Sequence, residues 1–97
     1  MRFNFVSGKL QALYVTGRGR YSADVIRAFF RVMGHLEHAV DERDLYALKG
    51  LHYEKLKGDR KGQHSLRLNK QFRLIVMPIG DPRNREMLVL EIVDYHG

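Results

Sequence analysis

The hydrophobic pattern of the chain changes its period at Gly50, and this change constrains the fold more than any other feature. Before Gly50, apolar residues recur at helical spacing. After it, four short segments alternate apolar and polar residues as β-strands do: residues 51–56, 63–69, 71–77 and 85–93. Consecutive strands with short connections normally pair antiparallel, so the second half is predicted to form a four-stranded meander.

The first half of the chain predicts one short strand followed by helices. Phe3 and Phe5 alternate with polar residues, as in a strand. Ser7 is placed to cap a short helix that ends at Gly17, and a second helix is predicted to start at Ser22. The apolar stripe of this second helix consists of Ile26, Phe29, Phe30, Met33, Leu36 and Val40.

A third, short helical turn is expected between Asp41, as its cap, and Gly50, as its end. These elements predict an α+β fold, in which a short N-terminal strand and two to three helices pack on one face of a mostly antiparallel four- to five-stranded sheet. Residues 1–97 are expected to form a single domain.

The absence of cysteine excludes a disulfide framework, thiol catalysis and a cysteine-based zinc site. His35 and His38 have a spacing that can bind metal, but no suitable acid cluster accompanies them, so we predict no metal site and no other cofactor. No stretch is apolar over the roughly 18 to 20 residues that a membrane span needs, and the N-terminus lacks the core of a secretory signal. We therefore expect no membrane partner and a cytoplasmic location.

Positive charge is concentrated in one segment of a chain whose net charge is +6. Residues 57–73 contain one anion, Asp59, and six cations: Lys57, Arg60, Lys61, Arg67, Lys70 and Arg73. Such a cluster supplies the non-specific part of nucleic-acid binding, although charge alone equally fits a solvated face.

The register of the middle hairpin follows from burial. If Leu68 faces Phe72 and Leu66 faces Leu74, the apolar side chains of both strands point to one core, whereas a slip by one residue would expose one set. Residues 69–71 then form a three-residue loop.

This register places Arg67 and Arg73 opposite each other on the other face of the sheet. Like charges directly opposite each other destabilise a sheet, so an anion is expected between or above them. That anion is either a neighbouring carboxylate, Glu54 or Glu91, or a bound phosphate.

The last predicted strand leads directly into Asp94, Tyr95 and His96. Both alternating sets of its side chains are apolar, as in a central strand covered on both sides. The alternation groups Asp94 with His96, beside the face that carries the arginine pair, and puts Tyr95 on the opposite side unless a bulge or bend after Val93 regroups them.

Alternation also assigns faces to the residues after Gly50. His52 and Glu54 share one face, and Tyr53 and Lys55 share the other. His64 shares the parity of the core leucines, which favours a partly buried structural role over a catalytic one.

Two stretches of the chain together resemble a known family. The segment LKGDRKGQHSLRLNKQFRLIV, residues 56–76, and the ending EIVDYH, residues 91–96, are similar to the HigB-type toxins of the RelE/ParE superfamily. The resemblance implies a small bacterial toxin that pairs with a helix-turn-helix antitoxin of the HigA type. It also implies that the toxin enters the A site of the ribosome, contacts its rRNA and cleaves mRNA there.

The resemblance assigns roles to individual residues. Metal-free RNA cleavage needs a base on the 2'-hydroxyl, an acid at the 5'-oxygen and cations for the phosphorane charge. His96 is the expected proton carrier, Asp94 its orienting group or the base, Tyr95 a hydrogen-bond donor or stacking group, and Arg73 the phosphate clamp. The expected RNA- or phosphate-binding residues are Lys57, Arg60, Lys61, Arg67 and Lys70.

Glu54 departs from the family pattern, in which a histidine commonly occupies this position. Glu54 can serve as a base but cannot carry a positive charge, and it could instead form a salt bridge with Arg67 or Arg73. His52 could then compensate for the missing histidine. Two other functions remain open: a non-enzymatic, ParE-like inhibitor of gyrase and a plain RNA-binding module.

Overall fold

The computed structural model describes residues 1–95 of the chain. The helices are α1 (Gly8–Thr16), α2 (Ala23–His38) and α3 (Glu42–Ala47), and the strands are β1 (Arg2–Phe5), β2 (Glu54–Lys55), β3 (His64–Arg67), β4 (Phe72–Ile79) and β5 (Glu86–Asp94). Two short 3₁₀ turns, η1 (Lys49–Leu51) and η2 (Gly58–Arg60), flank β2.

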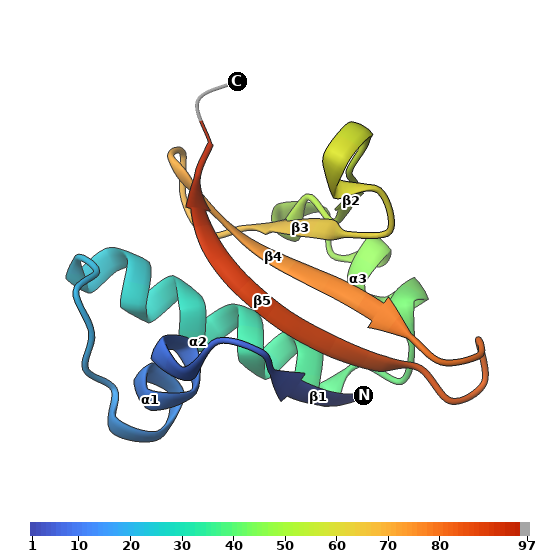
Figure 1. Cartoon of the computed structure of the whole chain (residues 1–97), viewed down its shortest axis with the longest axis horizontal. Coiled ribbons are helices and arrows are strands. Elements are labelled where there is room, and N and C mark those ends of the chain that lie inside the picture. The colour runs from blue at the N-terminus through green and yellow to red at the C-terminus, as the bar shows by residue number, and fades with distance from the viewer. Residues whose placement is uncertain (96–97) are drawn as a thin grey trace.

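The described strands form one sheet in the order β1-β5-β4-β3-β2. β1 runs parallel to β5, and all other neighbours are antiparallel. The long, curved strands β4 and β5 form the middle of the sheet, and α1 and α2 lie together on one side of it (Figure 1). The predicted α+β arrangement is therefore confirmed. None of the helices within residues 1–95 has the length and hydropathy needed to cross a membrane.

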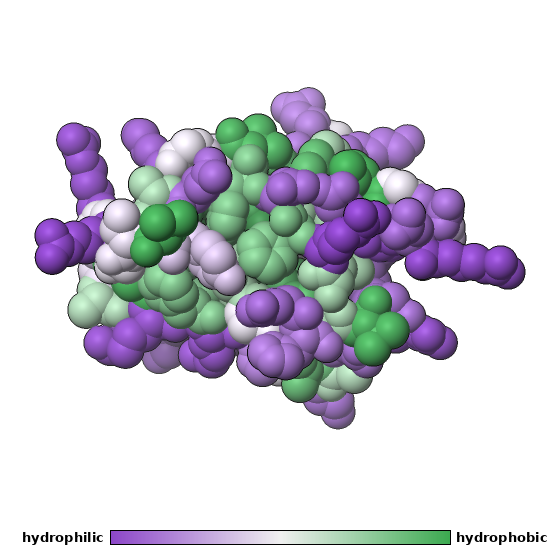
Figure 2. Space-filling model, turned by 90° about the horizontal axis from the view of Figure 1, so that it is seen from below, coloured by the Kyte–Doolittle hydropathy of each residue, from purple (hydrophilic) through white to green (hydrophobic). Residues whose placement is uncertain are grey.

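The core lies between these helices and the sheet. Leu13 of α1 and Phe29 of α2 are fully buried against Leu74 of β4 and Met87 of β5. Figure 2 shows the helix-bearing side of the molecule, where apolar side chains gather in the middle and hydrophilic side chains project from the rim. Burying such aromatic and aliphatic side chains contributes about 1.5 to 3 kcal/mol each and holds the helices on this face.

The predicted ends of α1 are confirmed by their capping contacts. The Ser7 hydroxyl accepts a hydrogen bond from the backbone N–H of Leu10 at 3.3 Å. Gly17 adopts the left-handed conformation, with φ of 73°, and its N–H donates to the carbonyl of Leu13 at 2.8 Å. A residue with a Cβ would be strained at this φ, which explains why a glycine ends the helix.

The predicted stripe of α2 is partly wrong. Phe30 is 37% exposed and Val40, which lies beyond the end of the helix, is 83% exposed. The buried face instead includes Val25, Ala28 and Val32. Apolar residues surround more than half of this helix, so its position against α1 and the sheet decides which of them are buried.

The short helix α3 begins as predicted and ends earlier than predicted. Asp41 caps it by accepting a hydrogen bond from the N–H of Arg43 at 2.9 Å. The helix ends at Ala47, and Gly50 lies inside η1 instead of terminating α3.

The strand predicted over residues 51–56 is wrong in its length, because β2 contains only two residues. His52 has a positive φ of 45°, which breaks the extended backbone before Glu54 and Lys55. The predicted alternation therefore fails at His52, although Glu54 and Lys55 do lie on opposite faces because they are successive strand residues.

The register of the middle hairpin is confirmed. Leu66 pairs with Leu74, and Arg67 pairs with Arg73. The N–H of Leu68 donates to the carbonyl of Phe72 at 3.0 Å, which closes the predicted three-residue loop.

The face assignment of β5 is wrong because the β4–β5 ladder contains a register shift. Val76 pairs with Val89, whereas Ile75 pairs with Glu91, so Leu90 is an extra residue on β5. This bulge exchanges the two sets of side chains after it. Asp94 consequently pairs with Phe72, on the core side, and does not share the face of the arginine pair.

Candidate functional site

Arg73 is the centre of a group of functional side chains on the face of the sheet opposite the helices. Its Nη2 donates a hydrogen bond to the backbone carbonyl of His52 at 2.6 Å and lies 4.0 Å from the Glu54 carboxylate. Its Cζ lies 5.3 Å from the centre of the Tyr95 ring, within the range of a cation–π contact. The Arg73 side chain is 12% exposed.

β5 brings Tyr95 to this arginine without the bend that the sequence required. Arg73 pairs with Val93, and Tyr95 lies two residues further along, on the same side. The backbone N–H of Tyr95 donates to the carbonyl of Gln71 at 2.6 Å, which holds Tyr95 beside β4. Tyr95 is 47% exposed, so the residue is accessible to solvent.

The role of His52 in this site comes from its backbone. Its left-handed conformation turns its carbonyl towards the Arg73 guanidinium. Sequence reasoning considered only the imidazole of His52 and missed this contact. Histidine is enriched among non-glycine residues with positive φ, but most histidines do not adopt it, so the sequence alone did not predict this turn.

The arginine pair is only weakly neutralised. Of the two predicted acids, Glu54 lies at the limit of ion-pair distance from Arg73 and its side chain is 57% exposed, whereas Glu91 pairs with Arg60 at 3.4 Å. The Nε of Arg67 donates to the carbonyl of Asn69 at 3.3 Å. Because exposed ion pairs contribute little free energy, Glu54 neutralises Arg73 only weakly. The positive charge of Arg67 and Arg73 is therefore available to a bound anion.

Asp94 lies apart from this group, at the end of β5. It pairs with Phe72 in the ladder, and its Oδ2 accepts a hydrogen bond from the Nε2 of Gln71 at 2.9 Å. The predicted proton carrier, His96, lies outside the described residues.

The predicted phosphate-binding cations are distributed over the surface. Lys57 and Lys70 are exposed, and Arg60 donates to Gln63 at 3.0 Å in addition to its contact with Glu91. Lys61 lines a cavity on the other side of β2. The structure thus brings Arg67 and Arg73 together, and separates Lys61 from them.

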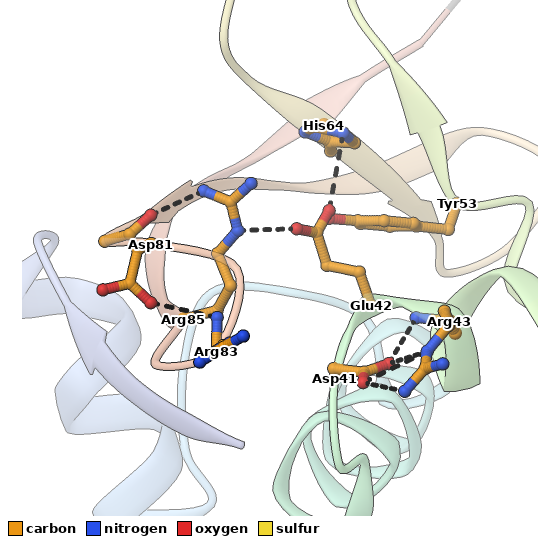
Figure 3. A network of polar contacts seen from close by, with 9 residues as sticks. Asp41, Glu42, Arg43, Tyr53, His64, Asp81, Arg83 and Arg85 are labelled. Carbon is orange, nitrogen blue, oxygen red and sulfur yellow. Dashed lines mark hydrogen bonds and ion pairs between the residues drawn. The ribbon is translucent and has the colours of Figure 1, made fainter.

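A second polar cluster, with no counterpart in the sequence interpretation, surrounds Glu42 (Figure 3). The Tyr53 hydroxyl donates to Glu42 Oε2 at 2.9 Å, and Arg85 Nε lies 3.1 Å from Glu42 Oε1. His64 stacks on Tyr53 with ring centres 4.7 Å apart, and its Nε2 lies 3.9 Å from Glu42. The predicted burial of His64 is confirmed, since the residue is 5% exposed.

Burial of His64 predicts that acid destabilises the fold. Desolvation lowers the pKa of His64 below its usual value of 6.5, so the folded chain binds this proton more weakly than the unfolded chain. The contribution of neutral His64 to the free energy of unfolding is therefore fully present above pH 6.5. Below this pH the free energy of unfolding falls, by at most about 1.4 kcal/mol per pH unit for one proton. Urea unfolding at about pH 7.5 and 5.5 measures this loss, which should be smaller in His64→Phe. An equal loss in both proteins would contradict the assignment.

Within residues 1–95, no group of three or more histidine, aspartate and glutamate side chains is arranged to hold a metal ion. The chemistry open to the Arg73 group is anion binding and proton transfer. A guanidinium offers a planar fork of donors for a phosphate, Tyr95 offers a ring and a hydroxyl, and Glu54 offers a carboxylate.

A protein-family model described as the RelE-like toxin HigB of type II toxin-antitoxin systems matches residues 3–96. No curated protein sequence gives a significant match.

Several solved structures share the fold at low sequence identity. The YoeB/ParE toxin from Agrobacterium tumefaciens is 15% identical, with a TM-score of 0.62 over 99% of this chain and 100% of that one. The YoeB-YefM complex from Staphylococcus aureus is 14% identical, with a TM-score of 0.62 over 100% and 98% of the two chains. The toxin-antitoxin complex RelBE2 from Mycobacterium tuberculosis is 14% identical, with a TM-score of 0.53 over 97% and 96%.

Proposed function

Because the chain belongs to the HigB, RelE-like toxins of type II toxin-antitoxin systems, we propose that it is an endoribonuclease that cleaves mRNA on the ribosome. The observation that supports this proposal is the group around Arg73. A largely buried arginine lies against an exposed tyrosine ring and near a carboxylate, on the side of the sheet that the helices leave open.

The proposed reaction is attack of a 2'-hydroxyl on the adjacent phosphate. A base removes the proton of the 2'-hydroxyl, the 2'-oxygen forms a bond to phosphorus, and the 5'-oxygen leaves with a proton from an acid, which yields a cyclic phosphate. Arg73 would bind the non-bridging oxygens, with Arg67 adding positive charge, as charge builds on the phosphorane. Tyr95 would stack on a base beside the cleaved phosphate.

Glu54 and His96 are the proposed proton-transfer groups. Glu54 lies near Arg73 on the same face and is exposed. When Arg73 binds the phosphate of an RNA strand, the 2'-hydroxyl of the adjacent ribose would come within reach of the Glu54 carboxylate. His96 is assigned as the acid on the sequence resemblance. Asp94 would act by holding the end of β5 through Gln71, which keeps Tyr95 at the site.

The proposed partners are an antitoxin of the HigA helix-turn-helix type, mRNA, and the A site of the ribosome with its rRNA. Two of the solved relatives are complexes of a toxin with its antitoxin, which supports an antitoxin partner here. The ribosome would hold the substrate in the reactive geometry, which supplies a large entropic share of catalysis. The proposed location is therefore the cytoplasm.

Transcript mapping in growing bacteria tests this function. Expression of the chain without its antitoxin should arrest growth and produce mRNA ends within translated regions, and co-expression of the antitoxin should prevent both. With purified components, mRNA should be cut only when it is bound to ribosomes. Growth arrest with intact mRNA and altered DNA supercoiling would contradict the proposal and indicate a ParE-like inhibitor.

A further inference from the structure

A cavity of about 600 Å³ opens on the side of β2 that faces away from Arg73. Glu54 and Lys55 are successive residues of β2, so their side chains point to opposite faces. Glu54 lies near Arg73, whereas Lys55 pairs with His64 and lines the cavity. The edge strand therefore separates the cavity from the Arg73 group.

Two lysines supply the free positive charge of this cavity. Lys55 and Lys61 both line it and both are exposed. In the described part of the chain, neither ammonium group lies within salt-bridge distance of a carboxylate. The two arginines at the cavity differ, because Arg85 is paired with Glu42 at 3.1 Å and Arg43 with Asp41 at 2.7 Å.

An exposed aromatic ring stands beside these lysines. Tyr46 of α3 is 49% exposed and lines the cavity. Its ring packs edge-on against Tyr53, with centres 4.8 Å apart and planes at 68°, and Tyr53 in turn stacks on His64. This support from behind fixes the Tyr46 ring while leaving much of its surface to solvent.

The wall of the cavity contains a buried polar group without a hydrogen-bond partner. His64 is 5% exposed, and among residues 1–95 neither of its ring nitrogens has a hydrogen-bond partner. Most buried polar atoms have partners, and one without a partner calls for an explanation such as local strain, an ordered water or a bound group. His64 lies beside Lys55, its cross-strand neighbour.

We propose that this cavity is a second binding site for single-stranded RNA, separate from the Arg73 group. Tyr46 stacks on a base, and Lys55 and Lys61 bind the adjacent phosphates. Stacking platforms beside unpaired cations are the usual means of holding single strands without reading their sequence. An acidic peptide would also attract the lysines, but it has no base to place on the tyrosine ring.

The proposal rests on the proposed function, since it adds a contact outside the cleavage site. The RNA is either mRNA that flanks the cut or an exposed strand of rRNA, which share the same chemistry. Neither source requires Tyr46 to take part in cleavage.

Binding of a labelled, single-stranded 2'-O-methyl RNA tests the site, because this probe cannot be cut by attack of a 2'-hydroxyl. Tyr46→Ala is expected to raise the Kd roughly 5- to 150-fold, the usual loss for one stacked base. Tyr46→Phe, which keeps the ring, should bind like the wild type. Changing both Lys55 and Lys61 to glutamine should reduce the slope of log Kd against log salt by about 1.4, and Lys49→Gln serves as the matched control.

If Tyr46→Ala disturbs folding, the double lysine variant still tests the site. Lys55 and Lys61 have exposed side chains, so replacing them should not disturb the fold. Unchanged RNA affinity in folded Tyr46→Ala and in the double lysine variant would overturn the proposal. So would a loss of antitoxin affinity in these variants without a loss of RNA affinity. RNA binding that needs Tyr46 in a protein that never cuts mRNA would instead refute the proposed function and leave this site standing.

A photo-crosslinking residue at position 46 identifies the source of the RNA. Crosslinks to mRNA near the cut or to one region of rRNA would each support the site and name its ligand. Crosslinks to protein alone, on ribosomes that carry mRNA, would overturn it.

Discussion

Replacing Arg73 with alanine should reduce cleavage of ribosome-bound mRNA about 100- to 1,000-fold, the range seen when one preorganised donor to a developing oxyanion is removed. The Arg73 guanidinium is largely buried and is held by the carbonyl of His52 and the ring of Tyr95, so its fork is already oriented before the substrate arrives. The loss should fall mainly on kcat, because the charge on the phosphate increases in the transition state. Single-turnover cleavage on programmed ribosomes measures it.

Two further variants separate the geometry of Arg73 from its charge. Arg73→Lys keeps a positive charge but lacks the planar fork, so its rate should lie between those of the wild type and Arg73→Ala. Arg83→Ala removes an exposed arginine at the β4–β5 turn, far along the hairpin from Arg73, and should cleave normally. If folded Arg73→Ala cleaves as fast as Arg83→Ala, Arg73 is not the phosphate clamp.

Replacing His96 with alanine should reduce cleavage by about 100- to 10,000-fold, the usual contribution of a proton-transfer group. The leaving 5'-oxygen needs a proton, and an imidazole that titrates at about pH 6.5 is well suited to supply it near neutral pH. The wild-type rate should therefore fall at high pH, where the proton donor is deprotonated, and this fall should be absent from the residual activity of His96→Ala.

His38→Gln is the matched control for this experiment. His38 is an exposed histidine at the end of α2, where its Nδ1 lies 2.8 Å from the carbonyl of Gly34, and it takes no part in the proposed reaction. Its variant should retain both the rate and the pH profile of the wild type. A normal rate in His96→Ala, with transcripts still cut on ribosomes, would assign the acid to another residue.

Local chemistry made several features of the fold predictable. Ser7 and Gly17 bound α1 because a hydroxyl satisfies a free N–H at one end and a glycine accepts positive φ at the other. The pairing of Arg67 with Arg73 followed from the leucines between which they lie, since a slip by one residue would expose the core.

The placement of residues around Arg73 was not predictable in the same way. The bulge at Leu90 exchanges the faces of β5, so that Tyr95 and not Asp94 lies with Arg73. The strand prediction across residues 51–56 failed because His52 takes a left-handed conformation. The exposed Phe30 shows the same limit in α2, where several apolar residues compete for one buried face.

The sequence by itself determined the α+β class, the limits of α1 and the hairpin register, because periodicity, capping and turn chemistry act between near neighbours in the chain. The family resemblance rested separately on the similarity of residues 56–76 and 91–96 to known toxins. The tertiary structure alone decided which side chains meet at Arg73 and which line the cavity behind β2. Those contacts join strands and helices distant in sequence, and a single extra residue in one ladder is enough to exchange them.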